Sequence, residues 1–288
     1  MIKILLQTTI ASDPDDWSIA RFSLLKAFLS SCRDGDGRAL FEVTARDRLP
    51  GPGPDEVLQH LDTTAFDQMW LFAVDIGNGL TPEDCEGIGR FHERGGGLML
   101  TRDHMDLGSS LCELAGRLGL AHHFHSRNKE PDEARRCRDD PYTTTILWPN
   151  YHSGANGDFQ DVQVIDPAHP LLRDPDSPTG LVRYLPAHPH EGVVALPDGA
   201  QTILAGVSRV SGNRFNIASV MERNGRSGRV LAESTFHHFC DFNWDPRMGS
   251  PSFVSETPGT GMLDSADALR STKQYMRNIA SWLTEAER

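Results

Sequence analysis

The sequence predicts an α/β fold in which a mainly parallel β-sheet is flanked by helices and extended by antiparallel strands. Through roughly the first 100 residues, short apolar runs alternate with segments of helical periodicity, which is typical of parallel strands joined by crossover helices. Further along, two strand-like runs flank Asn224-Gly225, a pair that favours a hairpin turn and therefore antiparallel pairing.

The expected elements follow in order along the chain. The strands of the parallel part are short apolar runs at 3–6, 41–45, 69–74 and 98–101. Two helices between them begin at cap signals, Asp13-Pro14 and Thr81-Pro82, and a third is expected at about 109–118. Later strands are expected at 162–165, 201–207, 215–222 and 229–233, and a closing helix from about Ser265.

The segment at about 122–160 is polar, rich in turn formers and too long for an ordinary connection. Because neither a repeat nor a linker divides the chain, we expect one domain over 1–288 that carries this insert. Within it, residues 149–158 predict either a lid over a ligand or two turns. We favour the lid, because Trp148 and Tyr151 would be costly to leave in water.

Composition narrows the class of partner. Asp and Glu number 40 against 28 Lys and Arg, a formal charge of −12, which argues against nucleic acid and anionic membranes as partners. No apolar run approaches the roughly 20 residues of a membrane span. Five scattered cysteines and an N-terminus without a signal-peptide pattern predict a cytoplasmic protein with reduced thiols. We expect a small-molecule ligand, and a homo-oligomer stays open.

Polar residues gather where the expected parallel strands end, and in open parallel sheets ligands bind at that edge. Two of these strand ends carry histidine, which is either part of a site or a loop cap. The residues are Asp75 and Asn78 after the third strand, Asp103 and His104 after the fourth, and His237 and His238 after the strand at 229–233.

Three segments resemble ThuA-like (trehalose-utilisation) proteins of the class I glutamine amidotransferase-like superfamily. They are 96–104 (GGLMLTRDH), 162–171 (VQVIDPAHPL) and 228–237 (GRVLAESTFH), in the family's order. The resemblance implies a flavodoxin-like sheet and a link to sugar metabolism. Residues 127–161 have no counterpart in the family.

The same resemblance exposes a missing nucleophile. Glutamine amidotransferases place a cysteine on the sharp turn after the fourth strand, where this chain has Asp103-His104-Met105. Cys112 lies eight residues after His104, about 12 Å further along if the segment is helical. The downstream His-x-Glu is also absent. We therefore expect no glutaminase chemistry.

Two functions remain open on the sequence. The leading hypothesis is an enzyme that acts on a sugar or related polyhydroxylated metabolite, with His104 and His237 as acid/base groups and Asp103 or Asp241 orienting one of them. The rival is a non-catalytic ligand-binding or scaffold protein on a degenerate amidotransferase fold. The expected ligand-binding residues are His238, Asp241, Asp75, Asn78, His152 and Asn156. Phe239, Phe242 and Trp244 could form either a sugar-stacking wall or core.

Histidine pairs raise the question of a metal. In 122–125 and in 188–190 two imidazoles lie two residues apart, on one face if the backbone is extended. A third ligand could come from Asp103, His104, His152 or His237. Because no closed ligand motif is present, we expect a metal to be absent or weakly held, and the sequence does not indicate a cofactor.

Overall fold

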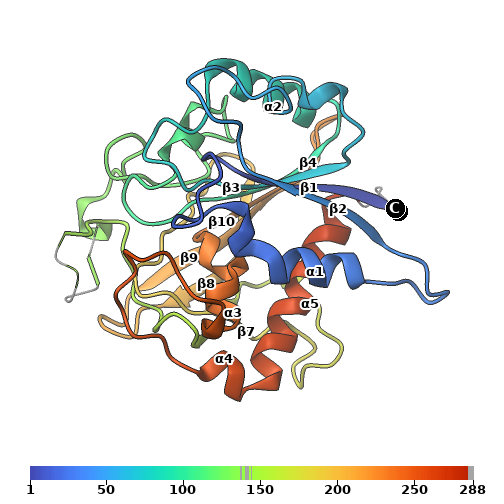
Figure 1. Cartoon of the computed structure of the whole chain (residues 1–288). Helices are drawn as coiled ribbons and strands as arrows, with labels where there is room; N and C mark the ends of the chain where they lie inside the picture. Colours follow the sequence, from blue (N-terminus) through green and yellow to red (C-terminus); the bar gives the residue numbers. More distant parts are fainter. Residues whose placement is uncertain (137, 140–142, 144, 285–288) are drawn as a thin grey trace.

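The computed structural model describes residues 1–136, 138–139, 143 and 145–284. Its main sheet has eight strands in the order β2-β1-β3-β4-β10-β9-β8-β6 (Figure 1). β2, β1, β3, β4 and β10 run parallel to one another, and β9, β8 and β6 continue the sheet antiparallel. The predicted fold class, a mainly parallel sheet extended by antiparallel strands, is confirmed.

The strands of the main sheet are β1 (Ile2–Thr8), β2 (Phe41–Arg46), β3 (Gln68–Phe72), β4 (Gly97–Thr101), β6 (Gln163–Val164), β8 (Ala200–Val207), β9 (Arg214–Met221) and β10 (Val230–Glu233). A separate antiparallel pair joins β5 (Phe159–Asp161) to β7 (Tyr184–Pro186). The α-helices are α1 (Ser23–Ser31), α2 (Pro82–Glu93), α3 (Asp241–Trp244), α4 (Gly261–Asp264) and α5 (Ala266–Trp282).

Helices cover both faces of the sheet, α2 on one side and α1 and α5 on the other (Figure 1). β3 shows why the sequence produces this arrangement: Trp70 and Phe72 pack in the apolar cluster under α1 and α5, whereas Met69 and Leu71 pack in the cluster under α2. Successive side chains of a strand point to opposite faces, so a continuously apolar strand needs a cover on both.

The predicted start of α2 is confirmed. Thr81 Oγ1 accepts a hydrogen bond from the Asp84 backbone N–H at 3.2 Å, and the Asp84 carboxylate accepts the Thr81 N–H at 3.0 Å. This reciprocal capping satisfies two backbone donors that a helix start leaves without partners. α2 ends at Glu93, just before Gly95, which has a φ of +107°.

The predicted cap of the first helix is wrong. Asp13 accepts the Asp15 N–H at 2.8 Å in a local turn, and α1 begins only at Ser23, after a short 3-10 turn (Ile19–Phe22). The cap comes from the distant Asp241, whose carboxylate accepts the N–H groups of Ser23 and Leu24 at 2.9 and 2.8 Å. A local carboxylate can serve a turn of its own as readily as a helix.

The helix predicted at 109–118 is reduced to a 3-10 turn, Ser109–Glu113. Leu114 takes an extended conformation, and Gly116 has a φ of +59°. A right-handed helix cannot contain that conformation, so the helix ends early.

The large aromatic side chains of the insert and of α3 are buried. Trp148 and Tyr151 are each 5% exposed, in line with the expectation that they would not stay in water. Phe239, Phe242 and Trp244 belong to the apolar core beside α1 and α5, which leaves no sugar-stacking wall there. Within the described part of the chain, no helix combines the length and apolar character needed to cross a lipid bilayer.

Candidate functional site

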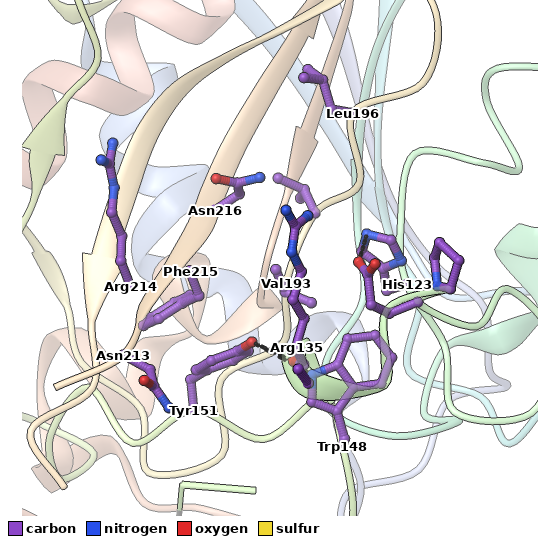
Figure 2. Close-up of a pocket in the computed structure, with 14 residues that line it drawn as sticks. His123, Arg135, Trp148, Tyr151, Val193, Leu196, Asn213, Arg214, Phe215 and Asn216 are labelled. Carbon is purple, nitrogen blue, oxygen red and sulfur yellow. Dashed lines mark hydrogen bonds and ion pairs between the residues drawn. The ribbon is translucent and has the colours of Figure 1, made fainter. Parts of the chain in front are cut away.

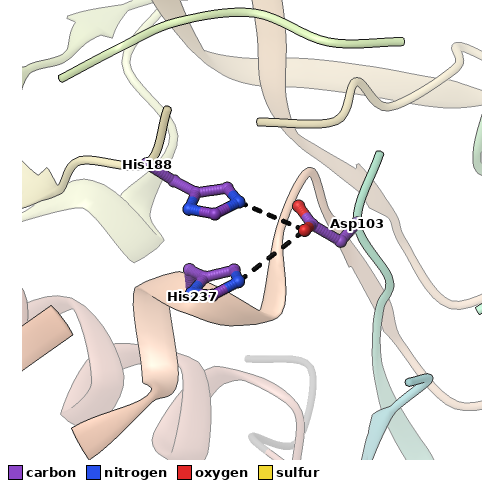
Figure 3. Close-up of side chains that lie close together, drawn as sticks. All are labelled: Asp103, His188 and His237. Carbon is purple, nitrogen blue, oxygen red and sulfur yellow. Dashed lines mark hydrogen bonds and ion pairs between the residues drawn. The ribbon is translucent and has the colours of Figure 1, made fainter. Parts of the chain in front are cut away.

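Three chain segments bring histidine to the carboxyl edge of the parallel strands. Asp103 and His104 follow β4, and His237 lies in a 3-10 turn (Phe236–Phe239) after β10. Because β4 and β10 are parallel neighbours, their carboxyl ends meet, and Thr235 Oγ1 donates to Asp103 Oδ1 across the gap at 2.8 Å. His188, after β7, completes the group from the side (Figure 3).

One carboxylate oxygen is the centre of this site. Asp103 Oδ2 lies 3.2 Å from His188 Nε2, 3.6 Å from His104 Nε2 and 3.7 Å from His237 Nε2. The His188 and His237 rings stack with centroids 3.6 Å apart. Asp103, His188 and His237 are at most 4% exposed, whereas the His104 side chain is 20% exposed. His104 therefore connects the buried group to solvent.

Two asparagines fix the tautomers of the stacked imidazoles. Asn243 Nδ2 donates to the Ala187 carbonyl and to Asn156 Oδ1, each at 2.9 Å. This orientation leaves Asn243 Oδ1 to accept the His237 Nδ1–H at 2.8 Å, and Asn156 Oδ1 to accept the His188 Nδ1–H at 2.9 Å. With hydrogen on Nδ1, each neutral ring presents a lone pair at Nε2, and both lone pairs face the shared carboxylate.

Burial disfavours the charged form of these imidazoles. Burial, together with neighbouring histidines, lowers the pKa of His188 and of His237 well below the usual value, and burial lowers the pKa of His104 as well. The ligand atoms of Asp103, His188 and His237 all lie within 4.8 Å of one another. A single cation placed among them could contact all three.

The pKa of His238 is shifted in the opposite direction, because this residue belongs to a separate buried ionic group. Its Nδ1 lies 3.0 Å from Glu233 Oε2 and its Nε2 lies 3.2 Å from Glu191 Oε1, and all three side chains are 0% exposed. Burial acts to lower the pKa of His238, but the two carboxylates outweigh it and raise that pKa to about 10. His238 is thus a charged internal residue, out of reach of an external ligand.

The turn after β4, where the sequence resemblance would place a nucleophile, is strained. Met105 has a φ of +47°, a value that no other non-glycine residue of the described segments approaches. Such strain collects at functional turns. Elsewhere burial raises the pKa of Cys112 to about 11 and that of Cys85 to about 12, so these thiols stay protonated. Cys137 lies outside the described residues.

We therefore expect the protein to release no ammonia from glutamine, because a nucleophilic thiolate is missing from the strained turn. The measurement is glutamate and ammonia formation from L-glutamine, with a C112A variant as the control. Release above background that disappears in a cysteine variant would contradict this.

The remaining predicted residues are dispersed. Asp75 is buried and accepts from Ser110 Oγ and the Gly77 N–H at 2.7 Å each, and Asn78 is exposed. Asp241 caps α1 rather than orienting a histidine. His152 is partly buried, and Asn156 belongs to the site through His188. Of the suggested pair 188–190, only His188 reaches Asp103, since His190 Nε2 lies 3.2 Å from Glu256.

A separate cavity of about 660 Å³ lies beside the start of β9 (Figure 2). Trp148, Tyr151 and Phe215 supply aromatic surface, and Arg135 and Asn216 supply polar groups. The Tyr151 and Phe215 rings stack with centroids 4.5 Å apart. Among the described residues that line this cavity, none belongs to the group around Asp103.

Sequence reasoning missed two residues that define the site. It named His188 within the pair at 188–190, with Asp103 or His237 among the possible third metal ligands, and it did not name Asn243. No spacing signal links them to Asp103, because they come from segments that only the fold brings together.

The fold has counterparts among solved structures. A putative ThuA-like protein from Parabacteroides merdae is 15% identical, with a TM-score of 0.53 over 99% of this chain and 92% of that one. The structure described as the mmIFT52 N-terminal domain is 11% identical, with a TM-score of 0.52 over 99% of each chain. The glutaminase domain of Trypanosoma brucei CTPS with bound acivicin is 14% identical, with a TM-score of 0.44 over 100% of this chain and 98% of that one.

No known protein family matches the sequence, and no curated protein matches it either. The likeness to the ThuA-like structure therefore concerns the fold alone, and it agrees with the mainly parallel α/β architecture that the sequence predicts.

Proposed function

We propose that the group around Asp103 is the catalytic centre of an enzyme that acts on a small polyhydroxylated molecule such as a sugar. The observation that carries the proposal is the convergence of three imidazole nitrogens on one buried carboxylate oxygen, within 3.7 Å, at the carboxyl edge of the sheet. The class of substrate is supported by the ThuA-like sequence segments.

His104 is the proton-transferring residue in this proposal. Its side chain reaches solvent, its Nε2 faces Asp103, and Met105 beside it holds the strained turn. A buried carboxylate next to an imidazole stabilises the imidazolium that forms when the ring accepts a proton. His188 and His237 stay held by their asparagine partners and shape the floor of the centre.

To test this, the protein is incubated with panels of monosaccharides, disaccharides and sugar lactones, and products are detected by mass spectrometry. The rate of conversion is expected to fall about 10²–10⁴-fold in H104A, the range for loss of a general acid or base. H125A, an exposed histidine 4.0 Å from Asp106, serves as the control. Equal turnover by wild type and H104A would refute the role of His104.

The two histidines named from the sequence should differ in their effect on stability. His237 is 3% exposed and bonded to Asn243, so it lies in the interior, whereas the His104 side chain is 20% exposed. We expect H237A to lower the free energy of unfolding by about 1–3 kcal/mol, because it leaves Asn243 without its donor. H104A should stay within roughly 0.5 kcal/mol. Urea unfolding of both variants checks this, and equal losses would contradict it.

A binding protein without catalysis is the second candidate, and the cavity in Figure 2 favours it. Aromatic faces with nearby polar groups suit hydroxyl-rich ligands. In that case a sugar would bind unchanged, W148L would abolish binding, and D103N would retain it. Turnover that depends on Asp103 would exclude this candidate.

A further inference from the structure

We infer that Asp103, His188 and His237 form the binding site for one divalent transition-metal ion. The inference stands on the geometry of the three side chains and goes beyond the proposed acid–base role of His104. The sequence led us to expect that a metal is absent or weakly held, because no closed ligand motif is present. The structure leads to the opposite inference, because it brings three ligands together from three distant segments.

The first argument is electronic. Both Nε2 atoms present lone pairs, because both Nδ1–H groups are committed to amide oxygens. These lone pairs face Asp103 Oδ2, another electron-pair donor, at 3.2 and 3.7 Å. Three electron-pair donors converge in a buried site, and a cation at their centre would interact favourably with all three.

The second argument is the support behind each ligand. Metal-binding histidines donate their other ring N–H to an oxygen acceptor, which fixes the ring and its tautomer. Here Asn156 and Asn243 supply those acceptors, and the Ala187 carbonyl orients Asn243. Thr235 binds Asp103 Oδ1 at 2.8 Å, which leaves Oδ2 for the ion.

The third argument is spacing. Two ligand atoms that are each about 2.1 Å from a tetrahedral ion lie roughly 3.4 Å apart. The distances from Asp103 Oδ2 to His188 Nε2 and to His237 Nε2, 3.2 and 3.7 Å, bracket that value. The two imidazole planes are stacked at 13°, so both rings must turn about their Cβ–Cγ bonds for their lone pairs to meet at one ion. Two imidazoles and one carboxylate suit Zn²⁺, Co²⁺ or Fe²⁺, whereas Ca²⁺ and Mg²⁺ prefer oxygen ligands throughout. His104, whose Nε2 lies 3.6 Å from Asp103 Oδ2, occupies the side of the group that reaches solvent.

The test is titration of chelator-treated, dialysed protein with Zn²⁺ and with Co²⁺ by calorimetry, together with the visible spectrum of the Co²⁺ form. We expect one ion per chain and the absorption of four- or five-coordinate Co²⁺. D103A, H188A and H237A should lose binding, and N156L should weaken it about 10–100-fold, the range for residues that orient a metal ligand.

The control is H169A, which removes another buried histidine that lies 3.1 Å from a carboxylate, that of Glu222. It should bind the ion as the wild type does. Because a ligand variant could fail to fold, circular dichroism is recorded for each, and the stoichiometry and Co²⁺ spectrum of the wild type need no variant. Absence of stoichiometric binding by the wild type, or equal binding by D103A and H169A, would overturn the site.

The outcomes separate this inference from the proposed activity. Stoichiometric, Asp103-dependent metal binding by a protein that converts no sugar would refute the activity and support the metal site. Sugar conversion by a protein that binds no ion, with no effect of chelator, would refute the metal site and support the activity.

Discussion

H238A is expected to lower the free energy of unfolding by about 3–5 kcal/mol, the cost of breaking a buried ionic group by removing one partner. The imidazole lies between Glu233 and Glu191, with no exposure to solvent. Its removal leaves two carboxylates facing each other in the interior. Ser234, Gln160 and Tyr275 donate hydrogen bonds to them, but none of these groups carries a positive charge.

The measurement is urea unfolding of wild type, H238A and the surface control H125A, whose imidazole is 45% exposed. The control should stay within roughly 0.5 kcal/mol of wild type. A loss below about 1 kcal/mol in H238A would show that the carboxylates take up a proton at little cost, and that the positive charge is not needed.

G108A is expected to destabilise the protein by about 2–5 kcal/mol and to displace the turn that carries His104. Gly108 has a φ of +78°, which costs an alanine about 1–2 kcal/mol. A Cβ would also lie 2.4 Å from the Ala73 carbonyl oxygen and 2.6 Å from Arg102 Cβ. That overpacking adds about 1–3 kcal/mol.

G116A is the matched control, since Gly116 has a φ of +59° but open space around its Cβ. G116A should lose only the stability that the positive φ costs an alanine. The difference in unfolding free energy between the two variants therefore measures the cost of the close contacts at Gly108. Thermal and urea unfolding give the stabilities. Equal effects in the two variants would mean that the contacts of Gly108 relax freely.

The parts of the fold that local sequence controls were predictable. The strands at 98–101 and 229–233 have apolar centres and are each preceded by glycine, and the structure places β4 and β10 on them as parallel neighbours. That pairing brings Asp103, His104 and His237 to one edge, so half of the candidate site followed from the chain itself.

What depends on distant partners could not be predicted. Asp13 has the residue type and position of a helix cap, yet Asp241 takes that role from the far end of the sequence. His188 and Asn243 gain their meaning only from contacts with Asp103 and His237. The periodicity of a sequence does not indicate which loops come into contact, because tertiary packing determines those contacts.

The position of β10 within the sheet has a consequence for synthesis on the ribosome. β10 is inserted between β4 and β9, and the carboxylate that caps α1 follows it along the chain. A chain emerges at about 5–20 residues per second, so β4 waits with one edge unpaired until Glu233 has been added. An unpaired strand edge templates association with other chains. The nascent protein therefore passes through a long interval in which its future centre is open and that edge is exposed to other chains.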